Sequence, residues 1–93
     1  MQYVYLNDKL IEAEQLILSM KNRGLFYGDG FFESIRFFNK KPFNFESHYQ
    51  RIKTSLQLLS LDFNLDKDSM VMNIQELLEK NNITNNGYVK LVF

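Results

Sequence analysis

The chain opens with alternating apolar and polar side chains, the pattern of a strand that buries one face. Residues 2–6 alternate in this way, and Asn7 and Asp8 supply a turn signal after them. Residues 10–11 are apolar and return the chain, so the sequence predicts a hairpin here. Residues 12–21 mix the strand period with the helix period, which leaves helix and strand both open for this stretch.

A second alternating run covers residues 31–38 and follows two closely spaced glycines. Because glycine suits tight turns, we expect a turn at residues 28–30 that leads directly into a strand. Asp29 is expected to hydrogen-bond the backbone of that turn. Residues 39–42 then predict a hairpin turn, with residues 43–45 as the returning strand.

Residues 47–61 carry apolar side chains at helical spacing and predict the first long helix. Asn44, or Ser47 together with Gln50, can cap its start. A helix with one apolar stripe packs that stripe against another element. The stripe consists of Ile52, Leu56 and Leu59.

A second helix is predicted over residues 67–81, with Asp66 or Asp68 as its cap. Residues 88–93 follow a turn and alternate as a last strand. The order of elements predicts an α+β lobe in which a mixed or antiparallel sheet carries two helices on one face. The second helix gathers its apolar residues on one stripe: Met70, Ile74, Leu77 and Leu78.

Composition restricts the possible functions. Ninety-three residues, 45% of them hydrophobic, suit one domain or one lobe and exclude two active domains. Equal numbers of acidic and basic residues give a net charge of zero, so we expect no nucleic-acid partner. The absence of cysteine and the single histidine exclude a disulfide framework and a protein zinc cluster. Without a long apolar run or a signal-peptide pattern, we expect no membrane contact and a cytoplasmic location.

The strongest candidate for chemistry on the first long helix is Arg51, which lies three residues after His48 on the same helical face. A fixed guanidinium can give a phosphate two parallel charge-assisted hydrogen bonds. The structural alternative is a surface arginine paired with Glu46 or Asp62.

Residues 23–36 spell RGLFYGDGFFESIR, residues 37–45 spell FFNKKPFNF, and residues 48–52 spell HYQRI. Together these motifs resemble the class IV aminotransferases, a pyridoxal-phosphate-dependent family that contains branched-chain aminotransferase, D-amino acid aminotransferase and aminodeoxychorismate lyase. The resemblance runs from about residue 3 to residue 93. It implies that residues 1–93 form the small N-terminal lobe of a two-domain enzyme.

The resemblance implies roles for individual residues. Arg51 would bind the phosphate of pyridoxal 5'-phosphate. The family keeps a histidine at position 48, and its place one helical turn before Arg51 favours a core histidine, or one that packs against or orients Arg51, over proton transfer. Tyr27 and Phe32 would line the substrate pocket, with Tyr27 reaching into the site of a neighbouring subunit. Arg36 would face the substrate and contact an acidic co-substrate such as 2-oxoglutarate. The alternative for Tyr27 and Phe32 is ordinary core packing in an aromatic-rich sheet.

The resemblance also implies what this stretch of chain lacks. The family carries its cofactor-bearing lysine in a second, larger domain, and none of the lysines here lies at that position. We therefore expect a chain truncated before that domain and inactive alone, with no catalytic residue of its own. The intact protein is expected to be a homodimer that acts on an amino acid, a 2-oxo acid or an amino-chorismate.

Lys90 is expected to face the domain interface or solvent, and Ser34 departs from the family's usual Gly or Thr.

A second hypothesis assigns the chain to a different class, a stand-alone and non-catalytic domain. Such a domain would use the same sheet to dimerise or to bind a small phosphate-bearing ligand. The last strand favours this hypothesis only if it ends at Phe93, because an exposed apolar edge at residues 91–93 otherwise invites pairing or aggregation.

Overall fold

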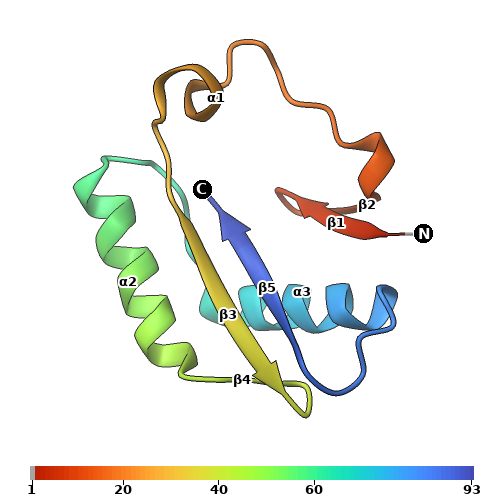
Figure 1. Ribbon diagram of the computed structural model, residues 1–93. Helices are drawn as coiled ribbons and strands as arrows, with labels where there is room; N and C mark the ends of the chain where they lie inside the picture. The colour runs from red at the N-terminus through yellow and green to blue at the C-terminus, as the bar shows by residue number, and fades with distance from the viewer. Residues whose placement is uncertain (1) are drawn as a thin grey trace.

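A three-stranded antiparallel sheet carries two long helices on one face, and a separate two-stranded hairpin packs beside the second of them (Figure 1). The computed structural model describes residues 2–93. The predicted α+β class, with two helices on one face of the sheet, is confirmed. The elements in chain order are β1 (Tyr3–Leu6), β2 (Lys9–Glu12), the short 3-10 helix η1 (Ala13–Gln15), α1 (Arg23–Tyr27), β3 (Phe32–Phe38), β4 (Lys41–Pro42), α2 (Phe45–Leu58), α3 (Lys67–Lys80) and β5 (Gly87–Val92).

The central strand β3 lies between β4 and β5 and divides the sheet into two faces. Its alternating pattern buries Ile35 and Phe37 against the helices and leaves their neighbours exposed. Each such burial stabilises the fold by roughly 1.5–3 kcal/mol. The core joins β3, β5 and α3 through Ile35, Phe37, Ile74, Leu78 and Val89.

The turn before β3 needs both of its glycines. Gly28 ends α1 in the left-handed conformation, with φ of 67°. A Cβ on Gly30 would lie 2.4 Å from the carbonyl oxygen of Phe93. That close approach lets Phe31 and Phe93 exchange two backbone hydrogen bonds of 3.0 and 2.9 Å, which extend the pairing of β3 with β5.

The predicted returning strand at residues 43–45 is wrong. The strand is Lys41–Pro42, and a two-residue turn at Asn39 and Lys40 connects it to β3. Both turn residues have positive φ, as a tight hairpin turn requires. Asn44 then takes a left-handed conformation, with φ of 54°, which ends the extended chain and starts a helix.

Helix α2 starts two residues before the predicted boundary and ends at Leu58. Asn44 occupies its cap position, but the Asn44 side chain makes no capping hydrogen bond. Ile52 and Leu56 are buried, as the predicted stripe requires, whereas Leu59 lies beyond the helix and is 47% exposed.

Helix α3 matches its prediction closely. The Asp66 side chain caps it by accepting from the amide of Asp68 at 3.2 Å and from the hydroxyl of Ser69 at 2.8 Å. The hydrogen bond from Ser69 holds the pKa of Asp66 below its usual value. Ile74 and Leu78 are buried on the predicted stripe.

The predicted hairpin of β1 and β2 is confirmed, and it packs on α3. The Asn81 side chain accepts from the Tyr3 amide at 2.8 Å and donates to the Tyr3 carbonyl at 3.0 Å. The Tyr5 hydroxyl donates to Glu76 at 2.7 Å. Burial and this bond to Glu76 raise the pKa of Tyr5 to about 12.

The stretch from residue 13 to residue 27 contains only the two short helices η1 and α1. Helix α1 was not predicted; it is capped by the Asn22 side chain, which accepts from the Leu25 amide at 3.0 Å. None of the described helices is long and apolar enough to cross a membrane. Large apolar side chains stay exposed along this stretch: Leu16, Ile17, Leu18, Met20, Leu25, Phe26 and Tyr27.

Candidate functional site

A carboxylate and two basic side chains meet between β3 and α2. Strand β3 places Glu33 on the same face as Ile35 and Phe37, so its carboxylate points under the helix. Helix α2 presents His48 and Arg51 one turn apart on its facing side. One oxygen, Oε1 of Glu33, accepts from Nε of Arg51 at 3.0 Å and also from Nη2 of Arg51.

His48 completes this cluster. Its Nδ1 lies 2.6 Å from Oε1 of Glu33 and 3.1 Å from Nη2 of Arg51. A carboxylate only accepts and a guanidinium only donates, so we assign a proton to Nδ1 and a hydrogen bond from His48 to Glu33. The approach of Nδ1 to Arg51 is then a contact between two donors. His48 therefore contacts both members of the ion pair and is hydrogen-bonded to Glu33.

The cluster controls ionisation of Glu33. Burial raises the pKa of the Glu33 carboxyl, but hydrogen bonds from Arg51 and His48 outweigh burial and hold it below its usual value. The hydrogen bonds that Arg51 donates to Glu33 also raise the pKa of Arg51. Glu33 is therefore a carboxylate at neutral pH, and its side chain is only 12% exposed.

Arg51 donates to Glu33 from the Nε and Nη2 side of its guanidinium, and its Nη1 has no protein acceptor within residues 2–93. The side chain is 63% exposed. The predicted alternative partners are wrong: Glu46 pairs with Lys67, and Arg51 pairs with Glu33 instead of Asp62. The free edge has the donor geometry that suits a phosphate.

The opposite face of the sheet carries two further predicted residues, Phe32 and Arg36. They point away from the helices, and Phe32 is 61% exposed, so the core-packing alternative for it is wrong. Across the strand pair, Arg36 lies opposite Tyr88 and Ser34 opposite Lys90. Lys90 places its Nζ 4.3 Å from the centre of the Phe32 ring, which adds a cation to this outer face.

Tyr27 ends α1 and is 70% exposed, so it is not a core residue either. The guanidinium of Arg23 lies 4.7 Å from the centre of its ring. Arg23 also donates from Nε to Asp29 at 2.5 Å. The expected bond from Asp29 to its own turn backbone is therefore replaced by an ion pair that ties the two ends of α1 together.

The structure separates the predicted residues into two groups. Arg51 contacts the face of β3 that carries Glu33, whereas Phe32 and Arg36 lie on the other face. Sequence reasoning missed Glu33 as a site residue. A signal was present: a lone carboxylate in the same alternating series as Ile35 and Phe37 lies on a buried face and requires partners there.

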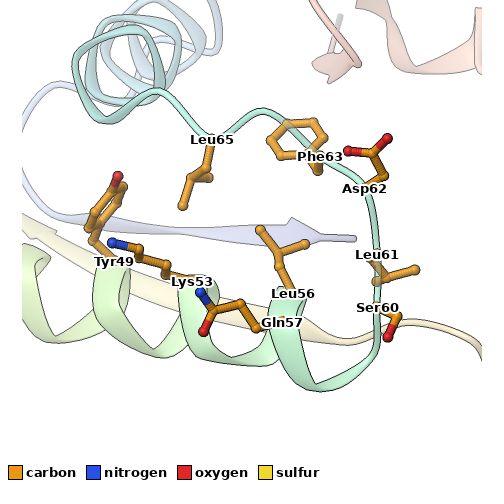
Figure 2. Close-up of a pocket in the computed structure, with 9 residues that line it drawn as sticks. All are labelled: Tyr49, Lys53, Leu56, Gln57, Ser60, Leu61, Asp62, Phe63 and Leu65. Atoms are coloured by element: carbon orange, nitrogen blue, oxygen red, sulfur yellow. The ribbon is translucent and has the colours of Figure 1, made fainter.

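A shallow groove of about 390 Å³ lies between α2 and residues 60–65 (Figure 2). Figure 2 shows Leu56 and Leu65 pointing toward each other across it, with Lys53 on one side. The predicted site residues do not line this groove. Its apolar walls suit side-chain packing better than phosphate binding, so the candidate site remains at β3 and α2.

Comparison with known proteins identifies the class. A family sequence model described as amino-transferase class IV matches residues 30–93. The match covers more than half of the sequence, so the chain belongs to the class IV aminotransferase family. A D-alanine aminotransferase from Staphylococcus epidermidis is 31% identical over 87 residues, covering 94% of this chain and 31% of the relative. The chain thus spans less than a third of the length of that relative.

Solved structures share the fold. A branched-chain amino acid aminotransferase from Escherichia coli superposes with a TM-score of 0.86 at 24% identity, over 98% of this chain and 31% of that chain. A Legionella pneumophila protein provisionally named 4-amino-4-deoxychorismate lyase gives a TM-score of 0.74 at 25% identity, over 86% of this chain and 29% of that one. The predicted family resemblance and lobe architecture are confirmed.

Proposed function

We propose that this chain is the N-terminal lobe of a pyridoxal-phosphate-dependent aminotransferase or lyase of class IV. The family match over residues 30–93 is the observation that carries the proposal. The relatives are longer than this chain, which covers 31% of the Staphylococcus epidermidis enzyme and 31% of the Escherichia coli enzyme. In this proposal the rest of the protein supplies the cofactor-bearing lysine, and the lobe alone is inactive.

Arg51 fits the phosphate of the cofactor. Its Nε and Nη2 are held by Glu33, and its exposed edge can donate to phosphate oxygens. When bound, pyridoxal phosphate withdraws electrons from the bonds at the substrate carbon that carries the amino group. The lobe would hold the phosphate and set its orientation.

The outer face of the sheet fits the wall of a substrate pocket. Phe32 and Arg36 are exposed there, and Lys90 adds a second positive charge. Tyr27 stands exposed at the turn that leads into β3. In this proposal the aromatic rings contact the side chain of an amino acid or the ring of an amino-chorismate, and Arg36 attracts the carboxylate of an acidic 2-oxo acid.

A homodimer is part of the proposal. The segment of residues 16–27 exposes a run of large apolar side chains, and such surfaces mark contacts with another protein surface. A second copy that covers this segment would also bring its Tyr27 to the partner's site. Light scattering of the protein made from its complete gene should give twice the chain mass, and a monomer at micromolar concentration contradicts this part.

Substitution of Arg51 by Ala in the protein made from its complete gene tests the phosphate assignment. Loss of charge-assisted hydrogen bonds of roughly 1.5–3 kcal/mol should weaken pyridoxal phosphate binding about tenfold to a hundredfold. Lys53→Ala is the matched control, because it removes a neighbouring cation from the exposed side of the same helix. Equal cofactor affinity in Arg51→Ala and Lys53→Ala would count against the assignment.

A further inference from the structure

Glu33 is unusual among the acidic residues of this chain because its carboxylate lies on the helix-covered face of the sheet. Its side chain is 12% exposed, whereas the carboxylates of Asp29 and Glu46 in the other ion pairs are 41% and 61% exposed. Removal of a carboxylate from water is unfavourable unless charged donors replace the water. The neighbouring inward residues Ile35 and Phe37 are purely apolar. A carboxylate at this position is therefore unfavourable for folding by itself, which points to a functional role for Glu33.

The three donors of the cluster converge on a single oxygen of Glu33. Oε1 accepts from His48 and from both Nε and Nη2 of Arg51. Nε and Nη2 define one edge of the planar guanidinium, so this contact fixes the plane of the group as well as its position. Within residues 2–93, Nη1 donates to no protein group, so its N–H groups and the second N–H of Nη2 remain for a ligand on a side chain that is 63% exposed.

We propose that Glu33 is the positioning residue for anion binding by Arg51: it fixes one guanidinium edge so that the other edge meets the phosphate in its bound orientation. This inference rests on the proposed function. A long arginine side chain normally loses much rotamer freedom when it binds a ligand, and a contact that orders it beforehand reduces that loss. His48 supports the arrangement because it donates to the same carboxylate oxygen.

Two effects of Glu33 on a phosphate oppose each other. A negative charge near an anion repels it, so removal of the charge by itself should tighten binding. Loss of the fixed guanidinium edge should weaken binding. Weaker phosphate binding after the Glu33 charge is removed therefore indicates a positioning role, whereas tighter binding indicates that Glu33 acts only through its charge.

The test compares pyridoxal phosphate with pyridoxal, which lacks the phosphate, on the protein made from its complete gene. Dissociation constants are measured by absorbance or fluorescence titration, so the readout does not depend on turnover. In Glu33→Gln, affinity for pyridoxal phosphate should fall about tenfold, because a neutral acceptor replaces a charged one, and affinity for pyridoxal should stay unchanged. Glu46→Gln is the matched control, since it removes an exposed carboxylate of α2 that pairs with Lys67.

A double substitution separates this inference from the proposed function. With Arg51→Ala already present, Glu33→Gln should no longer weaken pyridoxal phosphate binding, because the guanidinium that Glu33 positions is gone. Unchanged or tighter binding of pyridoxal phosphate in Glu33→Gln overturns the positioning role, as does an equal loss for both ligands. If Arg51→Ala leaves the affinity unchanged, the phosphate assignment in the proposed function fails as well.

Glu33→Asp keeps the test available if Glu33→Gln does not fold. It preserves the charge but shortens the side chain by one methylene, so the carboxylate withdraws from Arg51. Weaker binding of pyridoxal phosphate with unchanged binding of pyridoxal is again expected. Equal affinity of Glu33→Asp and the unsubstituted protein for both ligands overturns the proposal.

Discussion

The two faces of β3 differ in almost every property although their residues alternate along one strand. The inner face carries Glu33, Ile35 and Phe37 and is covered by helices, whereas the outer face carries Phe32 and Arg36 and is exposed. The inner charge has three donors on one oxygen, and the outer charge stands at the surface. One strand therefore holds the fold together through its inner face and leaves its outer face accessible.

The largest expected effect comes from a matched pair of phenylalanines on the two faces. Phe37→Ala should lower the free energy of unfolding by about 3–5 kcal/mol, because Phe37 is 2% exposed and leaves a cavity in the core. Phe32→Ala should change it by less than about 1 kcal/mol, because Phe32 is 61% exposed. Urea denaturation measures both. Equal destabilisation by the two substitutions would contradict the division into two faces.

The register between β3 and β5 decides which side chains reach each face, since a slip by one residue exchanges them. Gly30→Ala should destabilise the fold by about 1–3 kcal/mol, because the new Cβ would lie 2.4 Å from the backbone oxygen of Phe93. Gly28→Ala has open space around its Cβ but a φ of 67°, so it should be milder, about 1 kcal/mol. Thermal unfolding ranks the two, and a reversed order would contradict the close approach at Gly30.

The same strand shows what sequence patterns can and cannot predict. Alternation placed the strand at residues 31–38, and the structure has Phe32–Phe38. Helical spacing placed the second helix at residues 67–81, and the structure has Lys67–Lys80. These predictions succeed because burial of one face fixes the periodicity of each element locally.

Local backbone conformation limited the remaining predictions. The hairpin after β3 was misplaced because Asn39 and Lys40 make the turn and Asn44 bends the chain into α2, all three with positive φ. Positive φ is energetically unfavourable for residues other than glycine. Such residues adopt it only where the surrounding tertiary structure compensates for that cost, so local sequence alone does not predict it. Helix α1 was missed because it has only five residues.

For the candidate site, too, the sequence predicts some features and leaves others to the tertiary fold. Arg51 was predicted from its motif, and the exposed positions of Phe32 and Arg36 agree with their alternation. The structural alternative for Arg51 named Glu46 or Asp62 as its partner, but the partner is Glu33, 18 residues away in sequence. Only the packing of α2 on β3 brings these two residues together.

Acid should remove a stabilising contribution of Glu33 from the inner face. The pKa of Glu33 is depressed in the folded protein, so its contribution to stability is present above the unfolded-state value near 4.5 and is lost as the pH falls through the folded value. Glu33→Gln removes this dependence. Urea midpoints measured between neutral pH and pH 3 should therefore converge for the two proteins at the acid end. A constant difference between them would contradict the ionised cluster.

The smallest effect is expected away from both faces, at the hairpin on α3. Tyr5→Phe removes one hydrogen bond to Glu76 and should lower the free energy of unfolding by about 0.5–1.5 kcal/mol. It should leave affinity for pyridoxal phosphate unchanged, because within residues 2–93 neither Tyr5 nor Glu76 forms a hydrogen bond or ion pair with Glu33, His48 or Arg51. A loss of cofactor affinity in Tyr5→Phe would show that the site extends further than the two faces of β3.

The most direct test of the proposed class is borohydride reduction of the protein made from its complete gene in the presence of pyridoxal phosphate. Mass spectrometry then locates any trapped lysine. We expect one specific adduct on a lysine outside residues 1–93, with this lobe contributing Arg51 to the phosphate. No specific adduct, or one specific adduct on a lysine within residues 1–93, would contradict the assignment of this chain as the N-terminal lobe of a pyridoxal-phosphate enzyme.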